Sequence, residues 1–296
     1  TLFRSPQVSR PRRVTRVQIL DGVHLICWGF FKKVFIADHL SPIVDVTFHK
    51  AAAPGGEVWT ACFAFAVQIY CDFSGYTDIA RGVAKLMGFE FMLNFNLPYL
   101  ARNPQDFWSR WHISLSSWLR DYVYISLGGN RGGKASTYRN LFLTMLIGGF
   151  WHGAAWNFIL WGAYHGALLV AHRIWIAPCE HVIRRRGAVA TQILVMFIFT
   201  LYGWLLFRAT SLEQVYAFST TLWKPWDGFD LETARLVAMY SSPLIVVQAL
   251  QTLTRRLDWL SFAWIPVEAK AAVYAALVYA TVFAGGQPQS FIYFQF

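Results

Sequence analysis

The most informative segment of the chain reads Gly148-Gly149-Phe150-Trp151-His152-Gly153-Ala154-Ala155-Trp156-Asn157. It places a histidine in the middle of an apolar run that is typical of membrane-embedded sequence. No Asp, Glu, Lys or Arg occurs from Asn140 to His172, yet this run holds His152, His165 and His172. An ionisable group at membrane depth costs on the order of a few kcal/mol when charged, and imidazole suits proton transfer near neutral pH. The pattern favours a membrane enzyme whose base is reached from a water-filled or substrate-filled cavity.

The composition is that of a membrane protein. Hydrophobic residues make up 56% of the chain and charged residues 14%, whereas roughly a quarter of a soluble domain is charged. The apolar residues run on rather than alternate, which disfavours an outer-membrane barrel. We therefore expect an all-α, polytopic helical membrane protein that forms a single integral-membrane domain over residues 1–296. Because the chain begins with Thr and shows no signal peptide, we expect it to be the C-terminal portion of a longer protein.

The formal net charge of +10 arises from cations that gather at the borders of apolar segments. They lie at Arg4, Arg10, Arg12, Arg13 and Arg16, at Arg173, Arg184, Arg185 and Arg186, and at Arg255 and Arg256. Cytoplasmic loops of membrane proteins carry such an excess, and anionic lipid attracts it. The loop Arg173–Arg186 is therefore predicted to be cytoplasmic. A nucleic-acid partner is not expected, because no folded basic domain is evident.

Apolar runs near the length of a bilayer crossing predict several spans, since a helix needs about 20 residues to cross the hydrocarbon core. The predicted spans are Val189–Phe207, Leu236–Thr254, Val58–Cys71 with its polar extension, and Ala269–Ala284. Gln18–Ile36 is a weaker candidate, because it contains Asp21, Lys32 and Lys33.

The uncharged run Asn140–His172 is too long for a single span. As one helix it would measure about 50 Å at 1.5 Å per residue, against a hydrocarbon core of about 30 Å. Paired glycines weaken a helix and let other backbones approach. We therefore predict two shorter segments that meet near Gly148-Gly149.

The segment Asp106–Leu127 has an aromatic face. Its bulky residues recur at helical spacing, and they are Trp108, Trp111, His112, Leu115, Trp118, Leu119 and Tyr122. This periodicity predicts an amphipathic helix that lies at the interface or re-enters the membrane. The glycine-rich loop Gly128–Gly133 follows it and matches neither a Walker loop nor a dinucleotide-binding motif.

His152 is the first candidate for catalysis and His112 is the second. Both stand among apolar and aromatic residues, where the structural alternative is a buried histidine that hydrogen-bonds a neighbour. His165 is a poorer candidate: on one continuous helix it would point about 220° away from His152. No metal is expected, since neither the histidines nor the cysteines show metal-ligand spacing.

The segment Tyr70–Asp78 places carboxylates and hydroxyls at the end of an apolar run. One interpretation is a polar lining for a substrate channel, or side chains that satisfy a helix break. The structural interpretation is that Asp72 or Asp78 caps a helix or pairs with Arg81. A covalent serine hydrolase is not expected, because the sequence lacks a G-x-S-x-G elbow.

The chain resembles the membrane-bound O-acyltransferase family, and within it the bacterial branch that acetylates alginate and other exported polysaccharides. The matching blocks are Gly29–Val34 with Ile36–Asp38, Gln68–Tyr76, Asn94–Tyr99, Phe107–Ser114, Leu119–Tyr122, Leu127–Gly132, Phe150–Ala154 and Phe291–Phe296. These blocks occur in order over essentially the whole chain. The family's proteins are longer at the N-terminus, so the chain is expected to lack the first spans.

The resemblance implies a helical fold with a central tunnel or funnel and a catalytic histidine, which here is His152. The family's second polar position maps onto His112. Further substrate-binding candidates are Arg110, Trp108, Trp111, Asp72 and Asn157. The expected donor is acetyl-CoA or another acyl thioester on the cytoplasmic side, with no permanently bound cofactor. The expected surroundings are the lipid bilayer of a bacterial inner membrane, crossed several times, with an exported acetyltransferase partner and a polysaccharide acceptor.

Other functions remain open at this point. Intramembrane His and Asp residues also suit a proton-coupled transporter or channel, although no internal duplication is evident. A non-catalytic scaffold for polysaccharide synthesis is a further possibility. Within the enzyme class, the nearest alternatives are peptidoglycan O-acetylation and D-alanyl transfer to teichoic acid.

Overall fold

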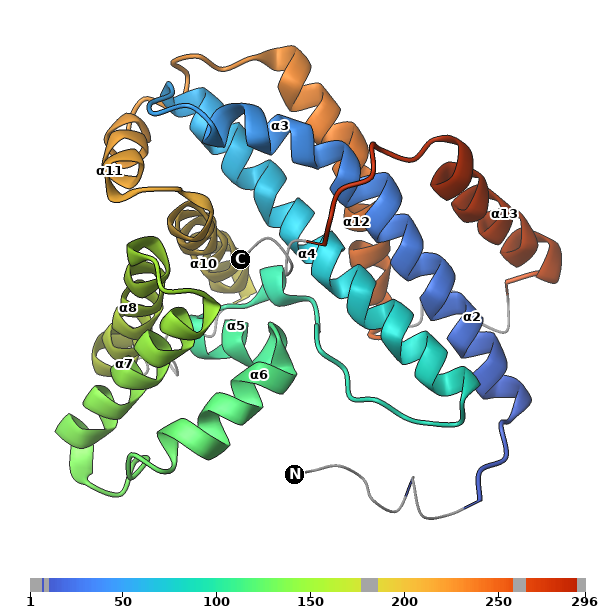
Figure 1. The fold of residues 1–296 in the computed structure, drawn as a ribbon, viewed down its shortest axis with the longest axis horizontal. Coiled ribbons are helices and arrows are strands. Elements are labelled where there is room, and N and C mark those ends of the chain that lie inside the picture. The colour runs from blue at the N-terminus through green and yellow to red at the C-terminus, as the bar shows by residue number, and fades with distance from the viewer. Residues whose placement is uncertain (1–6, 8–10, 177–185, 258–264, 292–296) are drawn as a thin grey trace. The chain divides into compact units, whose positions relative to one another are not determined.

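The computed structural model describes residues 7, 11–176, 186–257 and 265–291. Within these ranges all regular secondary structure is helical (Figure 1), which confirms the predicted all-α class. The contacts divide the chain into two compact units. Unit 1 comprises Thr1–Pro42, Val67–Met92 and Val237–Gln295, and unit 2 comprises Ile43–Ala66 and Leu93–Leu236. The predicted cytoplasmic charges Arg184 and Arg185, and most of the C-terminal block Phe291–Phe296, lie outside the described residues.

Unit 1 begins with one long helical segment. Thr15 caps α2 (Arg16–Phe30): its hydroxyl accepts the Gln18 N–H, and the Gln18 side chain accepts the Thr15 N–H. This reciprocal pair satisfies two N–H groups that a helix start leaves unbonded. The segment continues through the π-helix η1 (Phe31–Ala37) into α3 (Asp38–Phe48). The charges within the predicted span Gln18–Ile36 therefore do not interrupt the helical chain.

Glycines bring α2 against the second half of α4 (Gly55–Leu86). A Cβ atom on Gly22 would lie 2.9 Å from the Gly82 carbonyl oxygen, and one on Gly29 would lie 2.7 Å from the Gly75 carbonyl oxygen. Only glycine leaves room for backbones at such distances. Within unit 1, α2 and α4 therefore lie side by side (Figure 1).

Two buried lysines of η1 join α4 through ion pairs. Lys33 Nζ lies 2.6 Å from Asp72 Oδ1 and 2.9 Å from Asp38 Oδ1. Lys32 Nζ lies 2.7 Å from Asp78 Oδ2. Taking a charge out of water costs several kcal/mol unless a partner compensates it. These pairs therefore fix η1 on α4.

Two further helices pack in unit 1. They are α12 (Leu231–Thr254), whose first residues belong to unit 2, and α13 (Val267–Phe283). His39 of α3 stacks on Tyr240 of α12 with ring centroids 4.2 Å apart. His24 Nδ1 of α2 lies 3.1 Å from the Tyr274 hydroxyl of α13. Aromatic contacts thus hold both helices on the α2–α3 segment.

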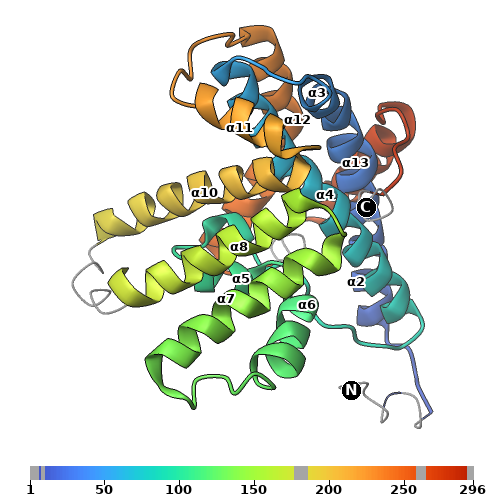
Figure 2. The same cartoon turned by 60° about the vertical axis from the view of Figure 1, so that its left-hand side comes forward.

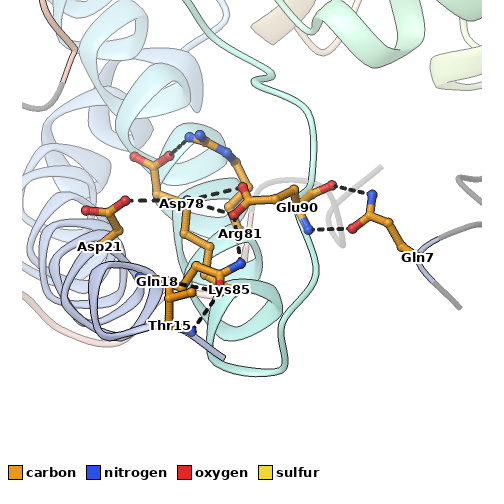
Figure 3. A network of polar contacts seen from close by, with 8 residues as sticks. All are labelled: Gln7, Thr15, Gln18, Asp21, Asp78, Arg81, Lys85 and Glu90. Atoms are coloured by element: carbon orange, nitrogen blue, oxygen red, sulfur yellow. Dashed lines mark hydrogen bonds and ion pairs between the residues drawn. The ribbon is translucent and has the colours of Figure 1, made fainter. Parts of the chain in front are cut away.

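A polar network ties the loop after α4 to α2 (Figure 3). The Glu90 carboxylate accepts hydrogen bonds from Lys85 Nζ at 3.2 Å and from Gln18 Nε2 at 3.3 Å. The Glu90 N–H donates to Gln7 Oε1 at 2.8 Å, and Lys85 also reaches Asp21 at 3.5 Å. Burial raises the pKa of Glu90, but the bonds from Lys85 and Gln18 outweigh it and leave that pKa below its usual value.

Unit 2 is built around a helical hairpin. Its two arms are α7 (Gly133–His152) and α8 (Trp156–Ala171), and α8 packs on α7 and on α10 (Arg186–Arg208) (Figure 2). A Cβ atom on Gly149 would meet the Phe158 carbonyl oxygen, and one on Gly162 would lie 2.5 Å from the Met145 carbonyl oxygen. The hairpin therefore depends on glycine at the contact between its arms.

The run Asn140–His172 forms two segments, as predicted, but the break lies elsewhere. The chain turns at Gly153–Ala155, whereas Gly148 and Gly149 lie inside α7. Both glycines serve close packing, since a Cβ atom on Gly148 would lie 3.1 Å from the side chain of Leu119. The predicted position of the break was therefore wrong because tertiary contacts, not flexibility, explain the paired glycines.

The single helix predicted over Asp106–Leu127 is wrong. The chain forms α5 (Pro104–Arg110), α6 (Ile113–Trp118) and the π-helix η3 (Leu119–Tyr124). His112 stands in the break with a left-handed φ of 44°. The preceding loop pairs with the backbone here: the Asn96 N–H donates to the Arg110 carbonyl at 2.9 Å, and the Ile113 N–H donates to the Asn94 carbonyl at 3.0 Å. Apolar periodicity continues across the break and cannot reveal it.

Two helices in the described ranges are long and apolar enough to cross a membrane. They are α10, over Ala188–Arg208, and α12. Both coincide with predicted spans, whereas the helices at the predicted spans Ala269–Ala284 and Val58–Cys71, α13 and α4, are not among these two. Unit 2 is completed by the short helix α11 (Leu212–Thr221), where the Ser211 hydroxyl accepts the Gln214 N–H.

Candidate active site

His112 is held in unit 2 by the loop that precedes α5. Its Nδ1 atom lies 3.4 Å from Asn94 Oδ1 and 3.3 Å from the Ser114 hydroxyl. The same Asn94 oxygen accepts hydrogen bonds from the Ser114 N–H at 3.0 Å and from the Ser114 hydroxyl at 2.9 Å. A non-glycine residue at positive φ is uncommon and is found disproportionately at functional sites. The contacts of Asn94 stabilise this conformation.

These hydrogen bonds define the protonation state of the His112 ring. A backbone N–H can only donate, so the Asn94 atom that faces Ser114 must be the amide oxygen. That oxygen accepts, so the His112 Nδ1 atom that faces it carries the proton. In the neutral ring Nε2 is then unprotonated and presents a lone pair.

His112 and His152 lie close enough for their charges to interact. Burial, and after it the charge of His152, lowers the pKa of His112 to about 3. Both effects disfavour an imidazolium. The ring at His112 is therefore neutral near neutral pH, as a proton or hydrogen-bond acceptor must be.

The His152 ring is enclosed by aromatic side chains of three helices. It meets Trp161 of α8 edge-to-face with centroids 5.2 Å apart, and Phe207 of α10 in the same way at 5.2 Å. Phe158 and Trp151 complete the enclosure at 6.2 Å and 5.1 Å. Perpendicular ring contacts of this kind are favourable and fix ring orientation. His152 as a whole is half-buried.

The turn between α7 and α8 positions His152 at the end of its helix. His152 is the last residue of α7, and Gly153 follows in an extended conformation. An added Cβ atom on Gly153 would lie 2.9 Å from the Phe158 ring. The close approach of the Phe158 ring thus favours glycine at this position of the Trp-His-Gly motif, beside the turn at which α8 folds back.

The predicted substrate-binding aromatics Trp108 and Trp111 lie in different surroundings. Trp108 meets Trp161 with centroids 5.7 Å apart. Trp111 is buried, and its centroid lies 4.8 Å from that of Trp204 and 4.9 Å from that of Phe95. The structure therefore brings Trp108 towards the His152 environment through Trp161, while Trp111 belongs to the adjoining core.

The predicted residues Arg110 and Asn157 have structural contacts. Arg110 Nε lies 2.6 Å from Asp106 Oδ1, and its Nη1 donates to the Asn96 carbonyl at 3.3 Å. Asn157 Nδ2 donates to the carbonyl of Ala209 at 2.9 Å, at the end of α10. Asn157 therefore fixes the start of α8 on α10, and its role in substrate binding stays a prediction.

Asp72 belongs to unit 1, where its carboxylate pairs with Lys33. Asp78 pairs with Arg81 at 3.2 Å, as the structural interpretation of this segment expected, and also with Lys32. A role of Asp72 in substrate binding stays a prediction.

The sequence did not single out the residues that position the two histidines. Asn94 and Ser114 orient His112, and Trp161 and Phe207 enclose His152. A signal existed for Asn94, because it is one of two amides, with Asn96, in the otherwise apolar stretch Phe91–Pro98. No sequence signal distinguishes Trp161 or Phe207 from the other aromatics of the chain.

His165 lies nearer to His152 than the sequence predicted. Its ring meets Trp161 with centroids 4.9 Å apart, and Trp161 also contacts His152. The turn at Gly153–Ala155 removes the continuous helix on which the two histidines would point apart. Within the described ranges, no group of three or more His, Cys, Asp or Glu residues is placed to hold a metal ion.

Several known proteins are similar in sequence to this chain. A probable alginate O-acetylase of Azotobacter vinelandii is 44% identical over 238 residues, which cover 79% of this chain and 47% of that protein. A peptidoglycan O-acetyltransferase of Helicobacter pylori is 44% identical over 197 residues, which cover 65% of this chain and 37% of that protein. The chain thus spans about half, or less, of the length of these relatives.

A more distant relative is a teichoic acid D-alanyltransferase of Bacillus subtilis. It is 29% identical over 204 residues, which cover 64% of this chain and 51% of that protein. The family model described as the membrane-bound O-acyltransferase family matches residues 16–215, a range that includes His112 and His152. The chain therefore belongs to the membrane-bound O-acyltransferase family, whose members are helical membrane proteins.

Proposed function

We propose that this chain carries the catalytic part of an O-acyltransferase that moves an acetyl group from a cytoplasmic thioester towards hydroxyls of an exported polysaccharide. Membership of the family supports acyl transfer. The 44% identity to a probable alginate O-acetylase supports acetyl as the acyl group and a polysaccharide as the acceptor. The alternative functions, a transporter or a scaffold, gain no support from these relatives, which are named as acyl-transferring enzymes.

The observation that carries this proposal is the proximity of two imidazoles in unit 2. His112 stands at the break between α5 and α6, and His152 stands at the end of α7. Each is placed by a helix end rather than within a helix. Acyl transfer needs a proton acceptor and a group that orients the acyl donor, and two such residues meet that need.

We assign the proton transfer to His152. The acceptor hydroxyl gives its proton to a His152 ring nitrogen while its oxygen forms a bond to the thioester carbonyl carbon. The C–S bond then breaks, and the thiolate that leaves takes up the proton. General-base catalysis of this kind contributes about 10²–10⁴-fold to a rate.

His112 has a different role, because its neutral ring has a lone pair on Nε2. It cannot donate to an oxyanion until it gains a proton, which its low pKa opposes. We therefore assign Nε2 to accept a hydrogen bond from an amide N–H of a pantetheine-type donor such as acetyl-CoA. This contact orients the acyl group for attack. Trp108 and Arg110 are proposed to line the donor's path, the arginine attracting its negative charge.

The surroundings proposed for the enzyme rest on its resemblance to the family. The chain crosses the bacterial inner membrane several times, with the donor on the cytoplasmic side. An exported acetyltransferase receives the acetyl group and passes it to the polysaccharide. No permanently bound cofactor is required, because acetyl-CoA or another acyl thioester is a substrate.

The experiment is to measure O-acetyl content of the exported polysaccharide in cells that carry the full-length parent gene with His152→Ala. His49→Ala is the matched control, because His49 is exposed and lies outside the cluster. We expect loss of acetyl ester at normal membrane abundance for His152→Ala and no change for His49→Ala. Unchanged acetylation in the His152 variant would refute the assignment.

The second candidate acceptor is peptidoglycan, favoured by the 44% identity to a peptidoglycan O-acetyltransferase. The two candidate acceptors are distinguished by which polymer carries the acetyl ester. Ester analysis of purified peptidoglycan and of exported polysaccharide from the same His152→Ala cells will show which polymer loses its acetyl groups. A loss of ester-linked D-alanine instead would point to teichoic acid.

A further inference from the structure

We propose that Trp108, Trp161 and His165 form a binding site for a single hydroxyl oxygen, supplied either by water or by an alcohol. The three rings contact one another pairwise. The centroid distances are 5.7 Å between Trp108 and Trp161, 5.1 Å between Trp108 and His165, and 4.9 Å between Trp161 and His165. We call these residues the ring triangle.

Each member of the ring triangle has a buried nitrogen without a hydrogen-bond partner in the described part of the chain. These atoms are Trp108 Nε1, Trp161 Nε1 and His165 Nδ1. Trp161 is 3% exposed and His165 is 2% exposed. Buried polar groups are almost always bonded, because an unmade bond leaves the full loss of hydration uncompensated. Three such atoms on three touching rings indicate a shared polar occupant.

The three rings are inclined to one another. The interplanar angles are 77°, 82° and 67°, so no two rings are stacked. In such contacts an edge of one ring faces the plane of another, and the nitrogen atoms lie on the edges. A competing interpretation is that the indole N–H groups point at aromatic faces, which is a weaker interaction.

The hydrogen-bonding capacity of the three nitrogens is matched by a hydroxyl oxygen. Both indole N–H groups can only donate, whereas His165 Nδ1 accepts or donates according to its tautomer. A hydroxyl oxygen accepts two hydrogen bonds and donates one, so it satisfies all three atoms when Nδ1 is unprotonated. A carbonyl oxygen leaves an unprotonated Nδ1 unbonded. Water and an alcohol share the required chemistry.

The ring triangle lies next to the proposed catalytic base, so its occupant is linked to the reaction. Trp161 contacts both His165 and His152, so the ring triangle adjoins the ring to which the proton transfer is assigned. Water there fixes Trp161, and thereby the orientation of His152. An alcohol there is an acceptor hydroxyl next to its base, and this second case rests on the proposed function.

The test is ultraviolet resonance Raman spectroscopy of the purified full-length parent protein without any acyl donor. The indole bands report whether each N–H is hydrogen-bonded, and difference spectra against Trp108→Phe and Trp161→Phe isolate the two indoles. We expect both to show the hydrogen-bonded position. A free or aromatic-facing N–H at both would overturn the proposal. The outcome does not depend on acyl transfer, so failure here is distinct from failure of the proposed function.

Two variants of nearly equal size test the part of His165. His165→Asn keeps a polar atom near the Nδ1 position, and His165→Leu removes it. We expect the Trp161 band to stay in place in the first variant and to shift towards the free N–H position in the second. An unchanged Trp161 band in His165→Leu would show that His165 is not part of the binding site. Thermal unfolding of both variants checks that they are folded.

The same spectra distinguish the two sources of the hydroxyl. Ethanol is the probe, added to the wild-type protein. A Trp161 band that shifts with ethanol supports an alcohol site, and a hydrogen-bonded band that does not shift supports bound water. Trp204→Phe is the control variant: its indole is also unbonded in the described part of the chain, but it lies outside the ring triangle.

Discussion

His152 and His165 both place their rings against the indole of Trp161, with centroids 5.2 Å and 4.9 Å from it. They reach it from different helices, His152 from the end of α7 and His165 from within α8. The turn between those helices makes this possible, because a continuous helix would carry the two rings to different faces. One tryptophan thus connects the proposed base to a second buried histidine.

Replacing Asn94 tests the tautomer assigned to His112. Asn94→Ala removes the acceptor that holds the Nδ1 proton, so we expect kcat to fall about tenfold, as for one lost hydrogen bond, with little change in KM. Asn94→Asp keeps an acceptor oxygen and should retain more activity. Steady-state kinetics of the full-length parent protein provide the measurement, and Asn130→Ala, at an exposed position, is the control.

The pH profile of Asn94→Asp separates positioning from general loss of structure. A carboxylate beside His112 stabilises the imidazolium and raises the pKa of that ring. The acidic limb of the rate profile should therefore move to higher pH than in the wild type. Equal losses in the Ala and Asp variants, with unshifted profiles, would contradict the role given to Asn94.

Gly149→Val is expected to destabilise unit 2. The added side chain meets the Phe158 carbonyl oxygen of α8, and backbone cannot move aside easily. Overpacking of this kind typically costs about 1–3 kcal/mol. The measurement is thermal unfolding of the detergent-solubilised parent protein. Ile147→Ala is the control, because Ile147 is 44% exposed on the same helix; similar melting of both variants would count against the packing argument.

Lys33→Met is expected to destabilise unit 1 strongly. It leaves the buried carboxylates Asp38 and Asp72 without this cation, and breaking a buried pair costs about 3–5 kcal/mol. The additional change Asp72→Leu should restore part of that stability by removing one uncompensated charge.

Lys50→Ala is the control for the Lys33 variants. Lys50 pairs with Glu57, but its side chain is 45% exposed, and pairs of this kind contribute about 0–1 kcal/mol. Unfolding midpoints and yields of folded protein compare the variants. A Lys33→Met protein as stable as Lys50→Ala would show that the buried pairs do not hold η1 on α4.

The lowered pKa of Glu90 predicts that the stability of the folded chain depends on pH. Its pKa is lowered in the folded chain, so its contribution is present above the unfolded pKa of about 4.3 and is lost as pH falls through the folded value. The effect is small, because the side chain is 45% exposed and therefore screened.

The comparison of wild type with Glu90→Gln measures this contribution. We expect the wild type to melt at a higher temperature at pH 7 and the difference to shrink as the pH falls below the unfolded pKa of about 4.3. Glu232→Gln serves as control, since Glu232 is 75% exposed. A difference between wild type and Glu90→Gln that grows as pH falls would be inconsistent with a lowered pKa.

The sequence by itself determined the class of the protein and its first catalytic candidate. Long uncharged runs predict membrane helices, and α10 and α12 coincide with two of them. Helix formation and membrane burial depend on the apolar content of a local window, which a sequence displays directly. The motif around His152 and the other matching blocks indicated the family in the same way, since the residues of each block are adjacent in the chain.

The tertiary structure alone decided how the candidate site is assembled. The break at His112 follows from hydrogen bonds with the loop at Asn94, and the tautomer of His112 follows from a side chain in that loop. The contact of His152 with Trp161 follows from a turn whose position the paired glycines did not reveal. Each of these features depends on contacts between residues that are distant in sequence, and helical periodicity reports only on neighbours three or four residues apart.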